Sequence, residues 1–177
     1  MIDRSTPASV LVIGYGNPGR LDDGLGPALV AALEAQAPPP GVTLDSNYQL
    51  NVEDAETIAA HDAVLFVDAD VAGPEPFGFE ALAPRVELGF SSHSVAPAAV
   101  LGLARQLFAA GTHGFVLGIR GHEFDEFGER LSARAQKNLD QAVRFVKDIL
   151  REDSAFRRDP ASYRPGPAEP SGDGEAT

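Results

Sequence analysis

Short apolar runs rich in β-branched residues alternate with stretches of helical periodicity along most of this chain. This alternation constrains the fold more than any other feature. The first run, Val10 to Ile13, is uniformly apolar and is closed by Gly14. A continuous run of this kind is typical of a strand buried on both faces, as in parallel sheets. Apolar residues then recur at helical spacing and predict a helix over about residues 24–35, which a run of three prolines ends.

The remaining elements repeat this pattern. Strands are predicted at residues 42–44, 63–67 and 115–119, and the weak alternation of residues 77–82 suits an edge strand. Helices are predicted near residue 53, over residues 95–108, and from the N-cap Ser132 onward. The order strand, helix, strand predicts an α/β fold with a single three-layer domain. We expect a mostly parallel twisted sheet between helices, and the pattern is compatible with an antiparallel edge strand.

The composition changes near Asp153. Residues 153–177 are rich in proline, glycine, serine, arginine and acids and contain few large apolar residues. Such a segment cannot offset the entropy lost on ordering. We therefore predict one domain over residues 1–152, followed by a disordered acidic and proline-rich tail over residues 153–177.

Charge and cysteine content exclude several functions. The formal net charge is -12 and the chain has no cysteine. An acidic surface repels phosphate backbones, so nucleic acid is not expected as a partner. Without cysteine, any metal must be held by imidazole and carboxylate groups. No segment approaches the roughly 18 apolar residues that a spanning helix needs, and the N-terminus does not resemble a signal peptide. We expect a cytoplasmic monomer that does not bind a membrane.

The loop after the first predicted strand, Gly14 to Gly19, matches the pattern of dinucleotide-binding loops. That function needs a helix N-terminus that faces a pyrophosphate. Here Asp22 and Asp23 stand at the start of the helix and would repel it. The loop also resembles the opening of bacterial peptidyl-tRNA hydrolases. That family places a catalytic histidine after the loop, and none stands between Gly19 and the first helix, so a hydrolase of this kind is kept as an alternative.

A third resemblance accounts for the acidic residues. Residues 14–17 (Gly-Tyr-Gly-Asn) and 23–26 (Asp-Gly-Leu-Gly) resemble the opening of the hydrogenase maturation proteases. Asp68, at the end of the third predicted strand, matches the aspartate of that family. His93, within Ser-His-Ser before a helix, matches its histidine. Residues 128–132 before the last helix are also similar, and the resemblance extends from about residue 10 to about residue 150.

The matching residues Asp23, Asp68 and His93 can form one site on physical grounds as well. In open α/β sheets, ligands bind outside the carboxyl ends of the strands. Crossover rules make the first and third strands plausible neighbours, which would bring the three side chains to one crevice. Two carboxylates and an imidazole suit zinc, nickel or a related divalent ion and leave positions open for water or substrate. We predict that Asp23, Asp68 and His93 are catalytic residues and metal ligands.

Each of these residues also has a structural interpretation. Asp22 or Asp23 alone could cap the helix, Asp68 could be a turn residue, and His93 could lie exposed in a loop. Their joint placement at one end of one sheet favours the site. We assign Asp22 the cap or a supporting role. No serine or cysteine stands in an obvious nucleophile elbow, so water is the expected nucleophile.

The other histidines are given structural interpretations. His61 and His113 lie just before and at the start of predicted strands and are expected to be structural or solvated. His122 belongs to an acidic, aromatic loop near the same end of the sheet as the predicted site. This loop is interpreted as a surface loop, although loops at that end often contact substrate.

The resemblance implies an endopeptidase that removes a C-terminal peptide from the large-subunit precursor of a nickel–iron hydrogenase after nickel insertion. The precursor would be the partner, and the metal would be the nickel of that substrate or another divalent ion. A non-catalytic nickel-sensing or chaperone module on the same fold is a further alternative. Departures from the family at residues 45–47 and 118–121 leave open which hydrogenase would be served.

Overall fold

The computed structural model describes residues 6–86 and 95–166. Within these residues the strands form one five-stranded sheet in the order β2-β1-β3-β5-β4. The strands are β1 (Val10–Tyr15), β2 (Val42–Asn47), β3 (Ala63–Asp70), β4 (Phe77–Leu82) and β5 (His113–Arg120). Four strands run parallel, and β4 runs antiparallel to β5 at the edge. The predicted sheet and its antiparallel edge strand are confirmed.

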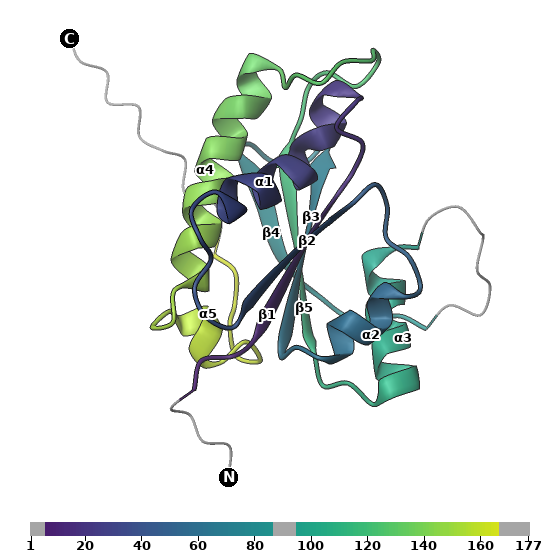
Figure 1. The fold of residues 1–177 in the computed structure, drawn as a ribbon, viewed down its shortest axis with the longest axis vertical. Coiled ribbons are helices and arrows are strands. Elements are labelled where there is room, and N and C mark those ends of the chain that lie inside the picture. The colour runs from purple at the N-terminus through teal and green to yellow at the C-terminus, as the bar shows by residue number, and fades with distance from the viewer. Residues whose placement is uncertain (1–5, 87–94, 167–177) are drawn as a thin grey trace.

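Helices cover both faces of the sheet and complete three layers (Figure 1). One face carries α1 (Leu25–Glu34), α4 (Ala133–Leu150) and the short α5 (Ala155–Arg158), and the other carries α2 (Asp54–Ala59) and α3 (Pro97–Phe108). A short 3-10 helix, η1 (Leu21–Gly24), leads into α1. The predicted single α/β domain is confirmed. None of the helices in the described ranges is long and apolar enough to cross a membrane.

The continuous apolar run of β1 serves two cores. Val10 and Val12 belong to the core beneath α1 and α4, whereas Leu11 and Ile13 belong to the core beneath α2 and α3. All four side chains are fully buried. A strand covered on both faces needs apolar residues at every position, so the run shows no alternation of polar and apolar residues.

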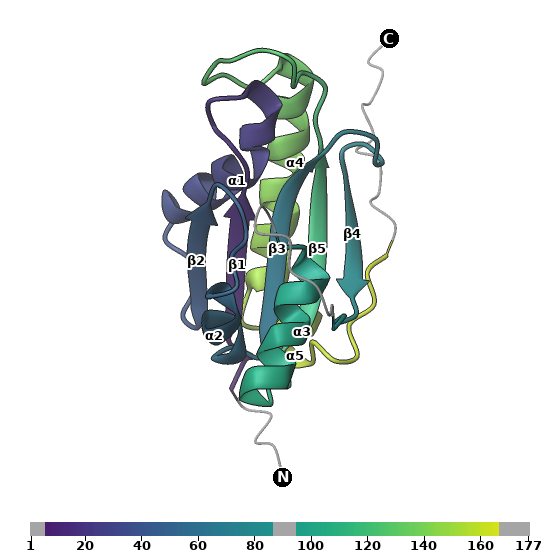
Figure 2. The same cartoon turned by 90° about the vertical axis from the view of Figure 1, so that its right-hand side faces the viewer.

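The candidate site forms where β1 and β3 end. These strands are parallel neighbours, with Gly14 of β1 opposite Val67 of β3. Tyr15 and Asp68 each follow these partners by one residue, so they lie at the same carboxyl edge of the sheet. Figure 2 shows η1 and the loop after β5 lying beyond this edge, at the top of the molecule. The expected pairing of the first and third strands is confirmed.

The chain beyond residue 152 differs from the predicted disordered tail. Residues 155–158 form α5, and Phe156 is fully buried in the core beneath α4. Arg157 is only 1% exposed. Its guanidinium donates hydrogen bonds to the carbonyl oxygens of Ala8 (2.9 Å), Leu150 (3.2 Å) and Pro40 (2.9 Å). The prediction is therefore wrong for residues 153–166, because a buried aromatic ring and a hydrogen-bonded arginine anchor a segment of polar average composition.

Candidate functional site

The turn between β1 and η1 holds Asp23 at the carboxyl edge of the sheet. Gly16 has a φ of +139°, and a Cβ at this position would lie 2.0 Å from the carbonyl oxygen of Asp23, so only glycine fits. The Asn17 N–H donates to the Asp23 carboxylate at 2.9 Å. The Gly19 N–H in turn donates to the side-chain oxygen of Asn17 at 2.9 Å. The glycine-rich loop thus holds the carboxylate of Asp23 in place, whereas a dinucleotide-binding loop would bind a phosphate.

Asp68 lies near the carboxyl end of β3, partly buried, in register with Gly118 of β5. Its Oδ1 accepts the Ala69 N–H at 2.7 Å, and its carboxylate also accepts a hydrogen bond from the Tyr15 hydroxyl. Burial, together with the nearby Asp23 carboxylate, outweighs these bonds and raises the pKa of Asp68 to about 6. Burial and the charge of Asp68 likewise raise the pKa of Tyr15 above its usual range.

The structure brings two of the three predicted site residues together. Asp23 and Asp68 lie close enough for their charges to interact. His93 lies outside the described residues, so its placement beside them stays a prediction. Within residues 6–86 and 95–166, no group of three His, Cys, Asp or Glu side chains could hold a metal ion. The two carboxylates supply oxygen ligands that suit a divalent cation once a further ligand is added.

Of the two roles predicted for Asp22, the helix cap is wrong. Its side chain is fully buried, and η1 has no side-chain cap. Its carboxylate accepts four hydrogen bonds: from the N–H groups of His122 (2.7 Å), Glu123 (2.9 Å) and Ser132 (2.7 Å) and from the Ser132 hydroxyl (2.7 Å). Burial disfavours the charged form, but these bonds prevail and hold the pKa of Asp22 below its usual range. Asp22 therefore ties the loop after β5 to the turn that carries Asp23.

The loop around His122 lies largely at the surface, as predicted, but His122 itself is mostly buried. The His122 side chain is 16% exposed, and its Nε2 faces the Glu75 carboxylate. Arg134 of α4 binds the same carboxylate through one nitrogen, at 3.0 Å and 3.1 Å from its two oxygens. The sequence signal for this arrangement is weak, because Glu75 precedes β4 and lies far from both partners along the chain.

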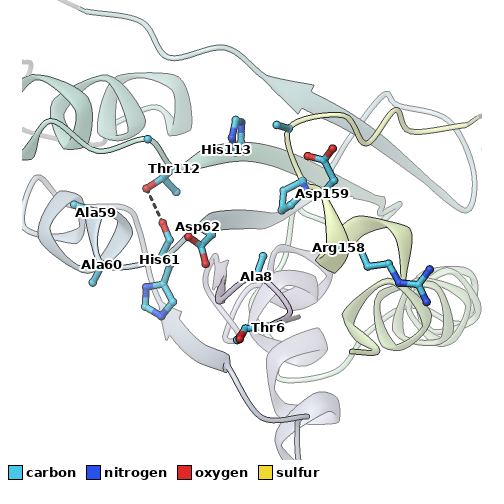
Figure 3. Close-up of a pocket in the computed structure, with 13 residues that line it drawn as sticks. Thr6, Ala8, Ala59, Ala60, His61, Asp62, Thr112, His113, Arg158 and Asp159 are labelled. Carbon is cyan, nitrogen blue, oxygen red and sulfur yellow. Dashed lines mark hydrogen bonds between the residues drawn. The ribbon is translucent and has the colours of Figure 1, made fainter. Parts of the chain in front are cut away.

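A separate cavity of about 500 Å³ opens at the amino edge of the sheet, away from the two aspartates. Figure 3 shows His61, His113 and Arg158 around it. Both ring nitrogens of His61 have partners, the Thr57 carbonyl oxygen at 2.8 Å and the Thr43 hydroxyl at 2.9 Å. The structural role predicted for His61 is confirmed, and the polar side chains of this cavity form no evident reactive group.

Comparison with known proteins gives a likeness of fold. No protein-family model and no curated protein matches the sequence. A NiFe hydrogenase maturation protease, HycI from Thermococcus kodakarensis KOD1, matches with a TM-score of 0.65 and 24% identity, over 82% of this chain and 94% of that chain.

Two further solved structures match over most of their length. A hydrogenase 2 maturation peptidase from Thaumarchaeota archaeon SCGC_AB-539-E09 gives a TM-score of 0.57 and 23% identity, over 77% of this chain and 94% of that chain. The hydrogenase maturating endopeptidase HybD from E. coli gives a TM-score of 0.57 and 20% identity, over 77% of this chain and 88% of that chain. This chain therefore shares the fold of these proteins.

Proposed function

We propose that this chain is an endopeptidase that removes a C-terminal peptide from the large-subunit precursor of a nickel–iron hydrogenase after nickel insertion. The observation that carries the proposal is the pair of interacting carboxylates, Asp23 and Asp68, at the carboxyl edge of a sheet. This edge is where open α/β folds bind their ligands. The three solved structures described above, which share this fold, are hydrogenase maturation proteases, peptidases or endopeptidases, which supports the substrate class.

The chemistry of the pair suits contact with a metal that the substrate already holds. Carboxylate oxygens and the imidazole of His93 would form a ligand set with positions left open for other groups. With a pKa of about 6, the Asp68 carboxyl is mostly ionised at neutral pH. Contact with the nickel of the precursor would orient the scissile peptide beside the two carboxylates, and orientation of this kind lowers the barrier by roughly several kcal/mol. Water is the proposed nucleophile.

Cleavage of a nickel-loaded precursor by purified variants tests the proposal. Asp23→Asn, Asp68→Asn and His93→Ala should each lose release of the C-terminal peptide, measured by mass spectrometry. Asp140→Asn makes the same chemical change on the exposed face of α4 and should cleave at the wild-type rate. Wild-type rates in all three site variants would contradict the assignment.

The same experiment separates the alternative functions. If the wild-type chain binds the precursor without cutting it, the non-catalytic nickel-sensing or chaperone function is favoured. Circular dichroism of each variant establishes that a lost activity does not reflect a lost fold. Because Asp23 and Asp68 are only partly buried, their replacement removes little buried apolar area and should spare the fold.

A further inference from the structure

An apolar groove opens beside the candidate site, between the η1–α1 segment and the end of the loop after β5. Its volume is about 260 Å³, below the range of about 300–1,000 Å³ typical of pockets for whole small molecules. The groove is lined chiefly by Pro18, Leu21, Pro27, Ala28, Ala31 and Leu131. A groove of this size and character suits one apolar side chain.

The groove shares a wall with the candidate site. Leu21, one of its lining residues, stands two positions before Asp23 in η1 and has a φ of +53°, in the left-handed region. Its N–H donates to the Gly128 carbonyl at 2.9 Å, and the Gly128 N–H donates to the Gly19 carbonyl at 2.8 Å. Backbone strain of this kind persists only where surrounding contacts hold it, and it clusters at functional sites. A side chain in the groove would therefore lie next to the segment that carries Asp23.

Phe127 lies in the loop that borders this groove, four residues before the lining residue Leu131. Its side chain is 87% exposed, and the Arg20 guanidinium lies over its ring at 5.9 Å from the centroid. The next residue, Gly128, packs so closely on Leu21 that a Cβ there would lie 2.9 Å from the leucine side chain. In Figures 1 and 2 this loop lies beside η1 at the top of the molecule. The exposed ring thus stands next in sequence to a glycine that packs on Leu21, one of the residues that line the groove.

The loop that borders the groove is predominantly acidic. It carries four exposed acidic residues: Glu123, Asp125, Glu126 and Glu129. Arg130 balances one of them by its ion pair with Glu123 at 2.9 Å. The remaining negative charge favours a cationic residue beside the occupant of the groove.

The loop is held in place before any partner binds. The Asp22 carboxylate fixes its first residues, His122 and Glu123, and Ser132 at its end. A surface ordered in advance loses less conformational freedom on binding than a flexible loop would. Rigid placement therefore suits this surface to recognition of a segment of substrate.

We propose that this surface is a recognition subsite for the precursor, in which the groove takes one apolar side chain next to the scissile peptide and the acidic loop binds a cationic neighbour of it. The subsite comprises the groove, Phe127 and the acidic residues of the loop. The identity of the bound segment rests on the protease function proposed above.

Kinetics on the nickel-loaded precursor test the subsite. Phe127→Ala removes the exposed ring of the loop, and Ala31→Phe fills the groove from an exposed position on α1. Each should raise KM by about tenfold with little change in kcat, because the interaction is made equally in the ground and transition states. The matched control is Leu107→Ala, which removes an apolar side chain that is 64% exposed on α3; it should leave KM unchanged. Unchanged KM in both subsite variants would overturn the proposal.

A binding measurement that needs no cleavage separates this proposal from the proposed function. The blocked peptides acetyl-Lys-Leu-Lys-amide and acetyl-Lys-Ser-Lys-amide are added to the ¹⁵N-labelled full chain. The leucine peptide should shift the amide signals of residues 126–131 and α1, the serine peptide should not, and Ala31→Phe should abolish the shifts. Equal shifts from both peptides would overturn the subsite. Binding of the leucine peptide by a chain that cuts no precursor would reject the protease function while the apolar subsite stands.

Discussion

The Ser132 hydroxyl donates a hydrogen bond of 2.7 Å to the Asp22 carboxylate and so joins the end of the β5 loop to the turn after β1. The same hydroxyl oxygen accepts the Ala135 N–H at 3.2 Å and caps α4. One serine therefore fixes both the start of a long helix and the residue next to Asp23. The geometry of the candidate site depends on a contact that spans 110 residues of sequence.

Asp22→Asn should destabilise the fold strongly. The amide nitrogen of asparagine would replace an acceptor oxygen in a fully buried site with four donors. A buried donor left without its partner costs about 1–3 kcal/mol, and more where a charged group is involved. Urea denaturation should show a loss of about 3 kcal/mol in the free energy of unfolding. The exposed control Asp140→Asn should change it by less than about 0.5 kcal/mol, and equal stability of the two variants would refute this role.

The contribution of Asp22 should also depend on pH. Its folded-state pKa lies below the usual range, so folding favours the ionised carboxylate. The stabilisation is complete above the unfolded-state pKa of about 3.9 and is lost as the pH falls through the folded-state pKa. The difference in unfolding free energy between wild type and Asp22→Asn should stay constant from about pH 8 to about pH 5 and shrink below about pH 4. If the difference in unfolding free energy grew as the pH fell, the lowered pKa of Asp22 would be contradicted.

The sequence predicted the position of Asp22 and left its role open between a helix cap and a support of the site. An acid before a helix indicates a cap, because capping partners lie a few residues away. The partners of Asp22 lie 100 to 110 residues away, and no local pattern reports such a distance.

Asp68→Asn should stabilise the protein above about pH 6. The folded-state pKa of Asp68 is about 6 against a usual value of 3.8, so ionisation opposes folding, and the wild type loses stability as the pH rises through this window. Asparagine has the same shape and avoids this cost, which is at most about 3 kcal/mol. Denaturation with EDTA present should show a larger gain at about pH 7.5 than at about pH 4. Equal gains at both pH values would contradict the raised pKa.

The segment after Glu152 should be required for stability, contrary to the expectation from its composition. Arg157→Ala leaves three carbonyl oxygens without their donors and should cost about 2–4 kcal/mol. Arg158→Ala, at the exposed neighbour, should cost less than about 0.5 kcal/mol. Truncation after Glu152 also removes the buried Phe156 and should lower Tm further. A truncated chain with wild-type Tm would show that α5 contributes nothing.

Much of the fold follows from local patterns in the sequence. The uniform apolar runs of β1 and β3 predict a parallel sheet covered on both faces, and the weak alternation of β4 predicts an edge strand. Both are observed. The interaction of Asp23 with Asp68 could be predicted because parallel strands end at the same edge. The anchoring of α5 could not, because it depends on two side chains, Phe156 and Arg157, rather than on average composition.

Nickel-dependent cleavage is the most direct test of the central claim, which is that this chain cuts a hydrogenase precursor by contacting nickel that the precursor holds. Precursor made with nickel and precursor made without it are each incubated with an excess of the purified chain, and the released C-terminal peptide is quantified. The account predicts release from the nickel-loaded precursor alone. Equal release from both would contradict recognition of nickel, and no release from either would contradict the proposed protease function.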